Sequence, residues 1–229
     1  MGLRDDCVHK SGVTAAKTAT WTADFVLVGA TKGGPTINVP NINLSINTAN
    51  VGVNGMLSGT PAVSSFVGVY LLYNPTTNTA ILGGVNTPGG GVCLPMICAA
   101  AGIPAGYTYS ALISSLWTNA SGQFVPFEQT GRSVVNTGAA AVSNAGVTAI
   151  SGFIWAGAPP EAINVSGYMA LQNSASGADS GAIYVNNLVG LGAINCNKNM
   201  NAAGGLAKFL FEISAQSNHC TRDVLLCNV

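Results

Sequence analysis

The chain has 229 residues, of which 48% are hydrophobic and only 7% are charged, and its formal net charge is zero. High hydrophobicity with little charge excludes an intrinsically disordered chain, and the scattered Lys and Arg residues do not favour nucleic acid as a partner. A soluble domain usually takes about a quarter of its residues from the charged types. The stretch from Gly33 to Phe127 contains no Asp, Glu, Lys, Arg or His, so we expect a large symmetric assembly to keep this protein ordered and in solution.

The first residues do not form a secretory signal, because Arg4, Asp5 and Asp6 place charge where an apolar segment would begin. The weakly polar stretch 89–106 contains prolines and several glycines, whereas a membrane-spanning helix needs about 20 helix-compatible apolar residues. We therefore expect a protein that is made, and stays, in a cytoplasm.

Strong helix formers such as Glu, Lys and Gln are scarce, whereas apolar and β-branched runs of strand length recur, which predicts an all-β chain with little helix. The clearest alternation of apolar and mildly polar residues follows Glu161 and is typical of a half-buried strand. The runs that predict strands are, in chain order, Trp21–Val28, Thr36–Ile46, Phe66–Tyr73, Ala111–Trp117, Gln123–Phe127, Glu161–Leu171, Gly181–Leu188, Lys208–Ile213 and Arg222–Leu226.

Turn-forming residues predict two hairpins, through residues 74–78 and 118–122, while residues 92–101 are expected to form a buried loop or one short helical turn. The simplest domain division is an N-terminal attachment segment, residues 1–20, followed by one β-rich domain, residues 21–229. The Ala-rich stretch 136–147 is a weak candidate for a subdivision of that domain.

Six cysteines, at positions 7, 93, 98, 196, 220 and 227, form no dense framework, so most are expected to be buried free thiols. Cys220 and Cys227 are close enough in sequence to bridge in an oxidising medium. His219 beside Cys220 matches no known zinc-ligand spacing, and neither does Cys7 with His9. We expect no metal and no cofactor.

Four short segments carry a resemblance to a known family. They are the Trp21-Thr22-Ala23-Asp24 start of an apolar strand, the run from Val69 to Thr77, the run from Pro104 to Ser114, and the hairpin from Thr118 to Phe124. These segments resemble the C-terminal, receptor-binding domains of bacteriophage and prophage tail fibres, over roughly residues 20–130. Cys93 to Cys98 is an insertion relative to that pattern, and nothing beyond Ala140 is similar to it.

The resemblance implies an antiparallel β-sandwich or jelly-roll-like domain that forms a homotrimer at the tip of a virion tail. It further implies attachment to a bacterial surface receptor, a polysaccharide such as lipopolysaccharide or an outer-membrane protein, without catalysis, and contacts with other tail proteins. Two alternatives remain open. One is a virion structural protein without receptor function, such as a tail collar, head fibre or decoration protein; the other is a glycan-degrading tailspike.

A tailspike would need two carboxylates across the glycosidic bond, and no pair is suggested by spacing. With two histidines and no Gly-x-Ser-x-Gly elbow, a serine nucleophile is not expected either, so we predict no enzymatic activity. The carboxylates available in the chain are Asp5, Asp6, Asp24, Glu128, Glu161, Asp179, Glu212 and Asp223.

Aromatic side chains are the better candidates for a receptor site, because their faces stack on sugar rings while Asn, Ser and Thr supply neutral hydrogen bonds. Such residues more often belong to a core or an interface than to a ligand site. The aromatic residues near predicted turns, and hence the predicted receptor-binding residues, are Trp117, Trp155, Tyr107 and Tyr109.

Overall fold

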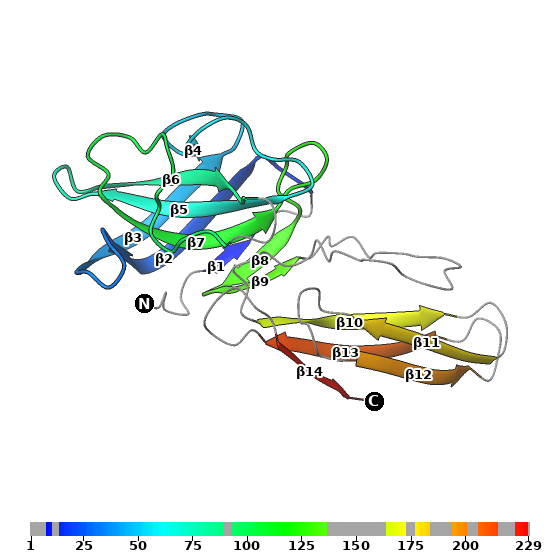
Figure 1. Cartoon of the computed structure of the whole chain (residues 1–229). Helices are drawn as coiled ribbons and strands as arrows, with labels where there is room; N and C mark the ends of the chain where they lie inside the picture. The colour runs from blue at the N-terminus through cyan, green and yellow to red at the C-terminus, as the bar shows by residue number, and fades with distance from the viewer. Residues whose placement is uncertain are drawn as a thin grey trace. The chain divides into compact units, whose positions relative to one another are not determined.

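The computed structural model describes the backbone of residues 8–10, 14–88, 93–136, 164–172, 177–183, 194–200, 206–214 and 223–228, and the side chains of residues 14–88 and 93–135. The chain divides into two compact units, Met1–Ser143 and Asn144–Val229, and each is described by itself. The described residues contain strands and irregular segments but no helix, which confirms the all-β prediction for this part of the chain (Figure 1). In particular, they contain no helix long and apolar enough to cross a membrane.

The first unit is one curled, mixed, nine-stranded sheet with the order β4-β6-β5-β7-β2-β1-β8-β9, in which β3 pairs with β2 outside this path. Most ladders are antiparallel, but β4 runs parallel to β6, so the expectation of a purely antiparallel sheet is wrong at this ladder. The strands are β1 (Val8–Lys10), β2 (Thr18–Gly29), β3 (Thr36–Asn47), β4 (Gly55–Met56), β5 (Phe66–Asn74), β6 (Thr79–Asn86), β7 (Tyr109–Trp117), β8 (Phe127–Thr130) and β9 (Ser133–Asn136).

The parallel ladder is short: β4 has only two residues, and it pairs with Gly83 and Gly84 of β6. The backbone N–H of Leu57 then donates to the carbonyl of Gly84 over 2.8 Å. Both β6 partners are glycines, Gly83 and Gly84, and an added Cβ would lie 2.7 Å from the Leu57 and Met56 side chains respectively. The two glycines therefore allow the close approach of β4.

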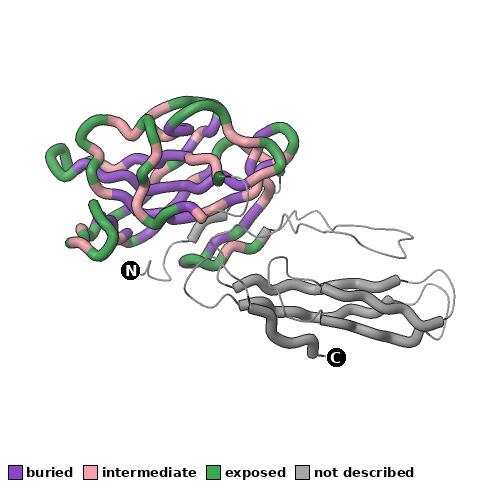
Figure 2. Tube along the Cα trace, in the orientation of Figure 1, coloured by how far each residue is buried: buried purple, intermediate pink, exposed green. Residues whose placement is uncertain are grey.

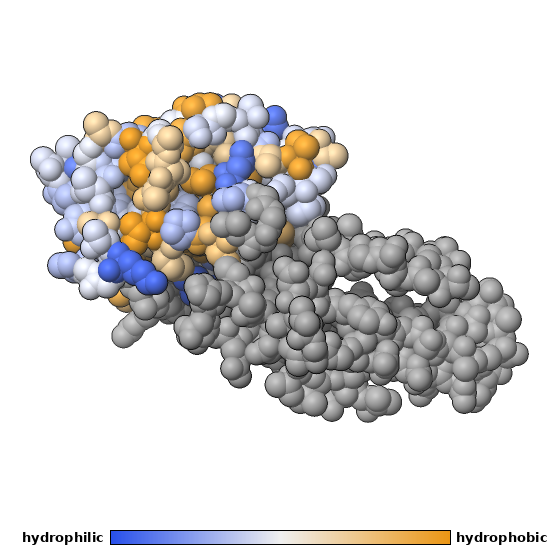
Figure 3. Space-filling view, viewed as in Figure 1, coloured by the Kyte–Doolittle hydropathy of each residue, from blue (hydrophilic) through white to orange (hydrophobic). Residues whose placement is uncertain are grey.

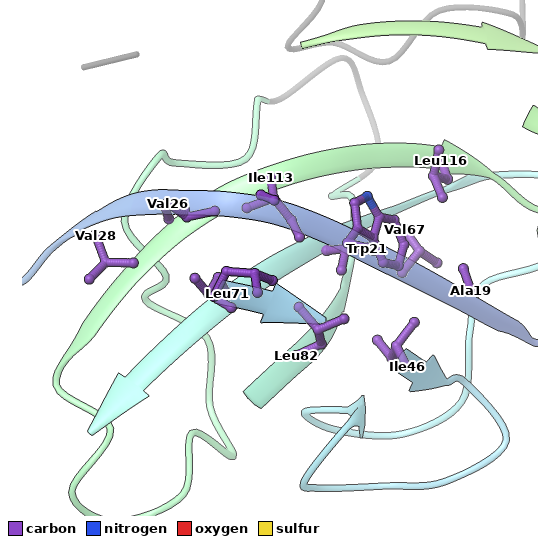
Figure 4. Packing of buried hydrophobic residues seen from close by; sticks show 14 of the residues in the cluster. Ala19, Trp21, Val26, Val28, Ile46, Val67, Leu71, Leu82, Ile113 and Leu116 are labelled. Atoms are coloured by element: carbon purple, nitrogen blue, oxygen red, sulfur yellow. The ribbon is translucent and has the colours of Figure 1, made fainter. Parts of the chain in front are cut away.

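The main core lies where the curled sheet brings β2 and β3 over β5, β6 and β7. Side chains from β2, such as Trp21 and Val26, point toward Leu71 and Ile113 from the other strands (Figure 4). Trp21 is fully buried, and its Nε1–H donates to Oε1 of the buried Gln129 over 3.1 Å. Buried residues concentrate in the strands of this unit and exposed residues in its loops (Figure 2).

A second core lies on the opposite face of β5, β6 and β7, which explains why every residue of β5 is buried. Here Tyr70, Leu72 and Leu112 pack with Leu94 and with partly buried residues of an irregular segment, residues 93–107, which we call the strap. The strap contains no helix, so of the two expected forms for residues 92–101 the described part takes the loop.

The strand predictions identify β2, β3, β5 and β7 closely, and both predicted hairpins form. The strand predicted over Gln123–Phe127 is displaced, since Phe124 makes only isolated bridges to Ala16 and Thr118 and the strand β8 begins at Phe127. The structure also contains strands that were not predicted, namely β1, β4, β6, β9 and β12. Residues 8–10 and 18–20 of the expected N-terminal segment belong to β1 and β2 of the sheet.

The second unit contains a three-stranded antiparallel sheet of order β10-β13-β14 and an antiparallel pair, β11 with β12. These strands are β10 (Asn164–Gln172), β11 (Gly177–Ile183), β12 (Ile194–Met200), β13 (Leu206–Ser214) and β14 (Asp223–Asn228). The alternating run predicted after Glu161 is β10, whose residues pair in register with β13 from Asn164 opposite Ser214 to Gln172 opposite Leu206. The predicted strand Gly181–Leu188 overlaps only the end of β11.

Candidate functional site: hydroxyl groups at the β5–β6 turn

The tight turn between β5 and β6 is built by an asparagine at its start. The side-chain oxygen of Asn74 accepts backbone hydrogen bonds from Thr76 and Thr77, over 3.0 and 3.3 Å, and Asn78 adopts a positive φ of 54°. Asparagine suits both positions because its amide mimics a backbone turn and it tolerates the left-handed region. The turn residues 75–79 are all exposed, which makes this hairpin tip a fixed and accessible part of the surface.

The strap ends against this turn. Gly106 has a φ of +88°, and a Cβ added there would lie 2.5 Å from Nδ2 of Asn74. Only glycine permits both the conformation and the contact. The next residue, Tyr107, is thereby placed beside the first residue of β6.

Three hydroxyl groups form a chain at this place. Oγ1 of Thr77 lies 2.7 Å from Oγ1 of Thr79, which lies 3.3 Å from the phenolic oxygen of Tyr107. The two threonines are exposed and Tyr107 is half-buried against the second core. Hydroxyl groups both donate and accept hydrogen bonds, so this chain offers neutral partners to a ligand next to one aromatic ring. We call Thr77, Thr79 and Tyr107 the hydroxyl chain.

Tyr109 lies at the same end of the sheet but on its other face. It stands directly opposite Tyr73, and both pack against the main core. The hydroxyl of Tyr73 donates to Oδ1 of Asn78 over 2.5 Å and so ties this face to the same turn. The two predicted tyrosines, Tyr107 and Tyr109, therefore flank one turn without sharing a face.

Trp117 is not part of this group. It ends β7, eight residues after Tyr109, which corresponds to about 26 Å along an extended strand. Its ring is half-buried and meets the ring of Phe66 edge-on, with centroids 5.0 Å apart and planes at 70°. The structure therefore places Trp117 and the two tyrosines at opposite ends of β7, and the fourth predicted residue, Trp155, lies outside the described residues.

The strap also contains the two cysteines whose side chains are described. Cys93 is disulfide-bonded, whereas Cys98 is a free thiol whose pKa is raised because burial disfavours the thiolate, with a backbone hydrogen bond from Ala100 acting in the opposite direction. The backbone N–H of Cys98 donates to Oγ of Ser110 on β7 over 2.8 Å. Cys93 is thus an exception to the expectation that most cysteines are free thiols, and Cys98 agrees with it.

Two carboxylate side chains are described, Asp24 on β2 and Glu128 on β8, and both are exposed. Asp179, Glu212 and Asp223 lie on β11, β13 and β14, where only the backbone is described. Within the described residues no three His, Cys, Asp or Glu side chains gather as they would around a metal ion. His219, Cys220 and Cys7 lie outside them.

Sequence reasoning missed Thr77 and Thr79, although the Asn-Pro-Thr-Thr-Asn run was recognised as a turn. Thr77 lies in the turn and only Thr79 belongs to β6, so the alternation of a strand gave no signal that their hydroxyls meet. Their contact with Tyr107 had no signal, because it depends on how the strap returns to the turn.

Comparisons of this chain with protein-family models, with curated proteins and with solved structures each gave no match.

Proposed function

We propose that this chain is a receptor-binding protein of a bacteriophage tail, which attaches the virion to a glycan on the bacterial surface and does not cleave it. The observation that carries the proposal is the hydroxyl chain: an exposed, fixed hairpin tip that offers only neutral hydrogen-bonding groups beside an aromatic ring. Sugars are recognised by this combination, because their hydroxyls need neutral partners and their ring faces stack on aromatic side chains.

The character of the surface supports the same class of ligand. On the face drawn in Figure 3 most of the described surface is weakly hydrophilic or apolar, and strongly hydrophilic groups are few and separate. Such a surface does not steer charged partners over a distance, so recognition relies on short-range contacts. Lipopolysaccharide is the receptor class that we propose, with an outer-membrane protein as the alternative.

The proposal includes a homotrimer with a β-sandwich or jelly-roll-like tip, in contact with other tail proteins through the virion. Support comes from the curl of the sheet around the main core and from the uncharged stretch between Gly33 and Phe127, whose side chains suit burial between subunits. Exposed apolar residues such as Val51, Val53 and Val63 are available for such contacts.

The test is adsorption of the purified protein to susceptible bacteria. We expect the double variant Thr79→Val and Tyr107→Phe to bind at least tenfold more weakly than the parent, because it removes two of the three hydroxyls and conserves side-chain volume. Thr36→Val, at an exposed position on β3, is the matched control and should bind like the parent. Equal binding by the double variant and the parent would contradict the proposed site.

Measuring the release of oligosaccharide from host polysaccharide distinguishes a receptor-binding protein from a tailspike. Host polysaccharide incubated with the protein should release no oligosaccharide, whereas a tailspike would release it. A structural virion protein would neither adsorb to the bacteria nor release sugar.

A further inference from the structure

Strand β3 is a sheet edge. It pairs with β2 along its whole length, from Thr36 opposite Gly29 to Asn47 opposite Thr18, and has no partner strand on its other side among the described strands. An edge strand presents unpaired backbone N–H and C=O groups, and proteins usually protect such edges with charged residues, proline or bulges. β3 has no charged residue along its twelve residues.

The direction of the backbone groups follows from two hydrogen bonds at the end of β3. The N–H of Thr48 donates to the carbonyl of Lys17 on the β2 side, whereas the N–H of Asn47 donates to Asn54, away from β2. Backbone groups alternate between the two sides of an antiparallel strand. Those of Ser45 and Asn43, which lie two and four residues before Asn47, therefore point to the free edge.

The open part of the edge has definite limits. At one end Asn54 already occupies the position beside Asn47. At the other end Pro40 lacks an N–H and Asn41 has a φ of 54°. The alternation of β3 also changes at this point, because the buried residue before Asn41 is Val39, whereas those after it are Ile42 and Ile46. Residues 42–46 remain, with Leu44 at their centre and with the exposed residues Asn43 and Ser45 on either side of it.

We propose that residues 42–46 of β3 pair antiparallel with the same residues of a second copy of this chain, about a twofold axis at Leu44. In this register Asn43 of one copy faces Ser45 of the other, and each such pair exchanges two backbone hydrogen bonds. The four outward N–H and C=O pairs are then all satisfied. Leu44 faces its own counterpart, and Ile42 faces Ile46.

A second copy is the partner that this segment fits best, because its pattern is self-complementary. Reading Ile42-Asn43-Leu44-Ser45-Ile46 in either direction gives apolar residues at the same three positions and neutral polar residues between them. Apolar residues therefore meet apolar residues across the axis, and no like charges oppose each other. An isologous contact of this kind joins two protomers and is distinct from the threefold contact of the proposed trimer.

Disulfide trapping tests the register directly. Residues that face each other in a non-hydrogen-bonded antiparallel pair have Cα atoms about 4.5 Å apart, which is within the range that a disulfide spans. Leu44→Cys protein treated with diamide, which oxidises two thiols to one disulfide, should form a covalent dimer at least tenfold faster than Ile37→Cys. Ile37 is likewise half-buried on β3 but lies about 46 Å from its counterpart in this register. The parent protein measures the background from the native cysteines.

A second pair of variants avoids any loss of packing at Leu44. Asn43→Cys and Ser45→Cys alter exposed side chains, and a mixture of the two should form the mixed dimer faster than either forms its own. Adding Ser45→Pro to Leu44→Cys should reduce trapping to the Ile37→Cys rate, since proline removes an N–H that has no partner on β2. Equal trapping rates for Leu44→Cys and Ile37→Cys, together with no preference in the mixture, would overturn the contact.

The outcome is independent of the proposed function, which rests on adsorption to bacteria. If the disulfide dimer forms but the protein does not adsorb to bacteria, the β3 contact is supported and the receptor proposal is contradicted. If the protein adsorbs but the disulfide dimer does not form, the receptor proposal is supported and the β3 contact is contradicted.

Discussion

Strand β5 is buried on both faces, but the two faces are covered in different ways. The face that carries Val67, Val69 and Leu71 belongs to the core shared with β2 and β3, where cover comes from other strands of the curled sheet. The face that carries Tyr70 and Leu72 lies under the strap, which has no regular structure. A loop can cover a sheet in this way only if its buried backbone groups find individual partners.

The strap meets that condition with separate hydrogen bonds. The hydroxyl of Tyr70 donates to the carbonyl of Pro95 over 2.6 Å, and the N–H of Leu112 donates to the carbonyl of Met96 over 2.9 Å. The strand-covered face is thus covered by strands whose backbones are joined by continuous ladders of hydrogen bonds. The strap-covered face is held by individual hydrogen bonds, each of which can be lost separately. We therefore expect core substitutions on the first face to destabilise the whole unit and those on the second to loosen the strap.

The largest effect is expected for Trp21→Ala on the strand-covered face. Removing a fully buried indole leaves a large cavity and takes away the N–H that donates to Gln129, so the free energy of unfolding should fall by about 3–5 kcal/mol. Urea denaturation followed by circular dichroism measures this loss. Trp117→Ala, the same change at a half-buried position, is the control and should cost clearly less. Equal losses would contradict the assignment of Trp21 to the centre of the core.

A smaller effect is expected for Gly68→Ala under the strap. The new Cβ would lie 2.2 Å from Cδ1 of Leu94, so the leucine or the strap must move, at a cost of about 1–3 kcal/mol. Limited proteolysis should then cut the strap near Ala99–Ala101 faster than in the parent, while the strands of the sheet stay protected.

A double-mutant cycle identifies the contact responsible. Leu94→Ala removes the clashing methyl groups, so Gly68→Ala should cost less in the Leu94→Ala background than in the parent. Strictly additive losses of unfolding free energy would show that Leu94 is not what Gly68 accommodates.

The same difference between the faces explains how far sequence reasoning reaches. The strands β2, β3, β5 and β7 were predicted because each is a long apolar or alternating run, a local property of the chain. β6 was not predicted, and it contains Gly83 and Gly84, which allow Leu57 and Met56 to approach at close range. That role depends on residues far away in sequence and leaves no local pattern.

The candidate site was predictable to a similar degree. Tyr107 and Tyr109 were selected because aromatic residues stood near a turn, and the structure places them at one end of β7. Trp117 was selected on the same ground, yet it lies at the other end of the strand and packs against Phe66. Proximity to a predicted turn does not distinguish the two ends of a strand, since both are followed or preceded by turns.

The smallest effect, and the sharpest measure of how the strap is held, is expected for Tyr70→Phe. The ring stays in the core, and only the hydroxyl that donates to Pro95 is lost, so the free energy of unfolding should fall by about 1 kcal/mol. Amide hydrogen exchange should become faster in the strap and remain unchanged in β2 and β3. Tyr73→Phe is the matched control, because its hydroxyl reaches Asn78 in the turn and not the strap. Faster exchange in β2 after Tyr70→Phe would mean that the strap and the strand-covered face open together, against the independence of the two faces.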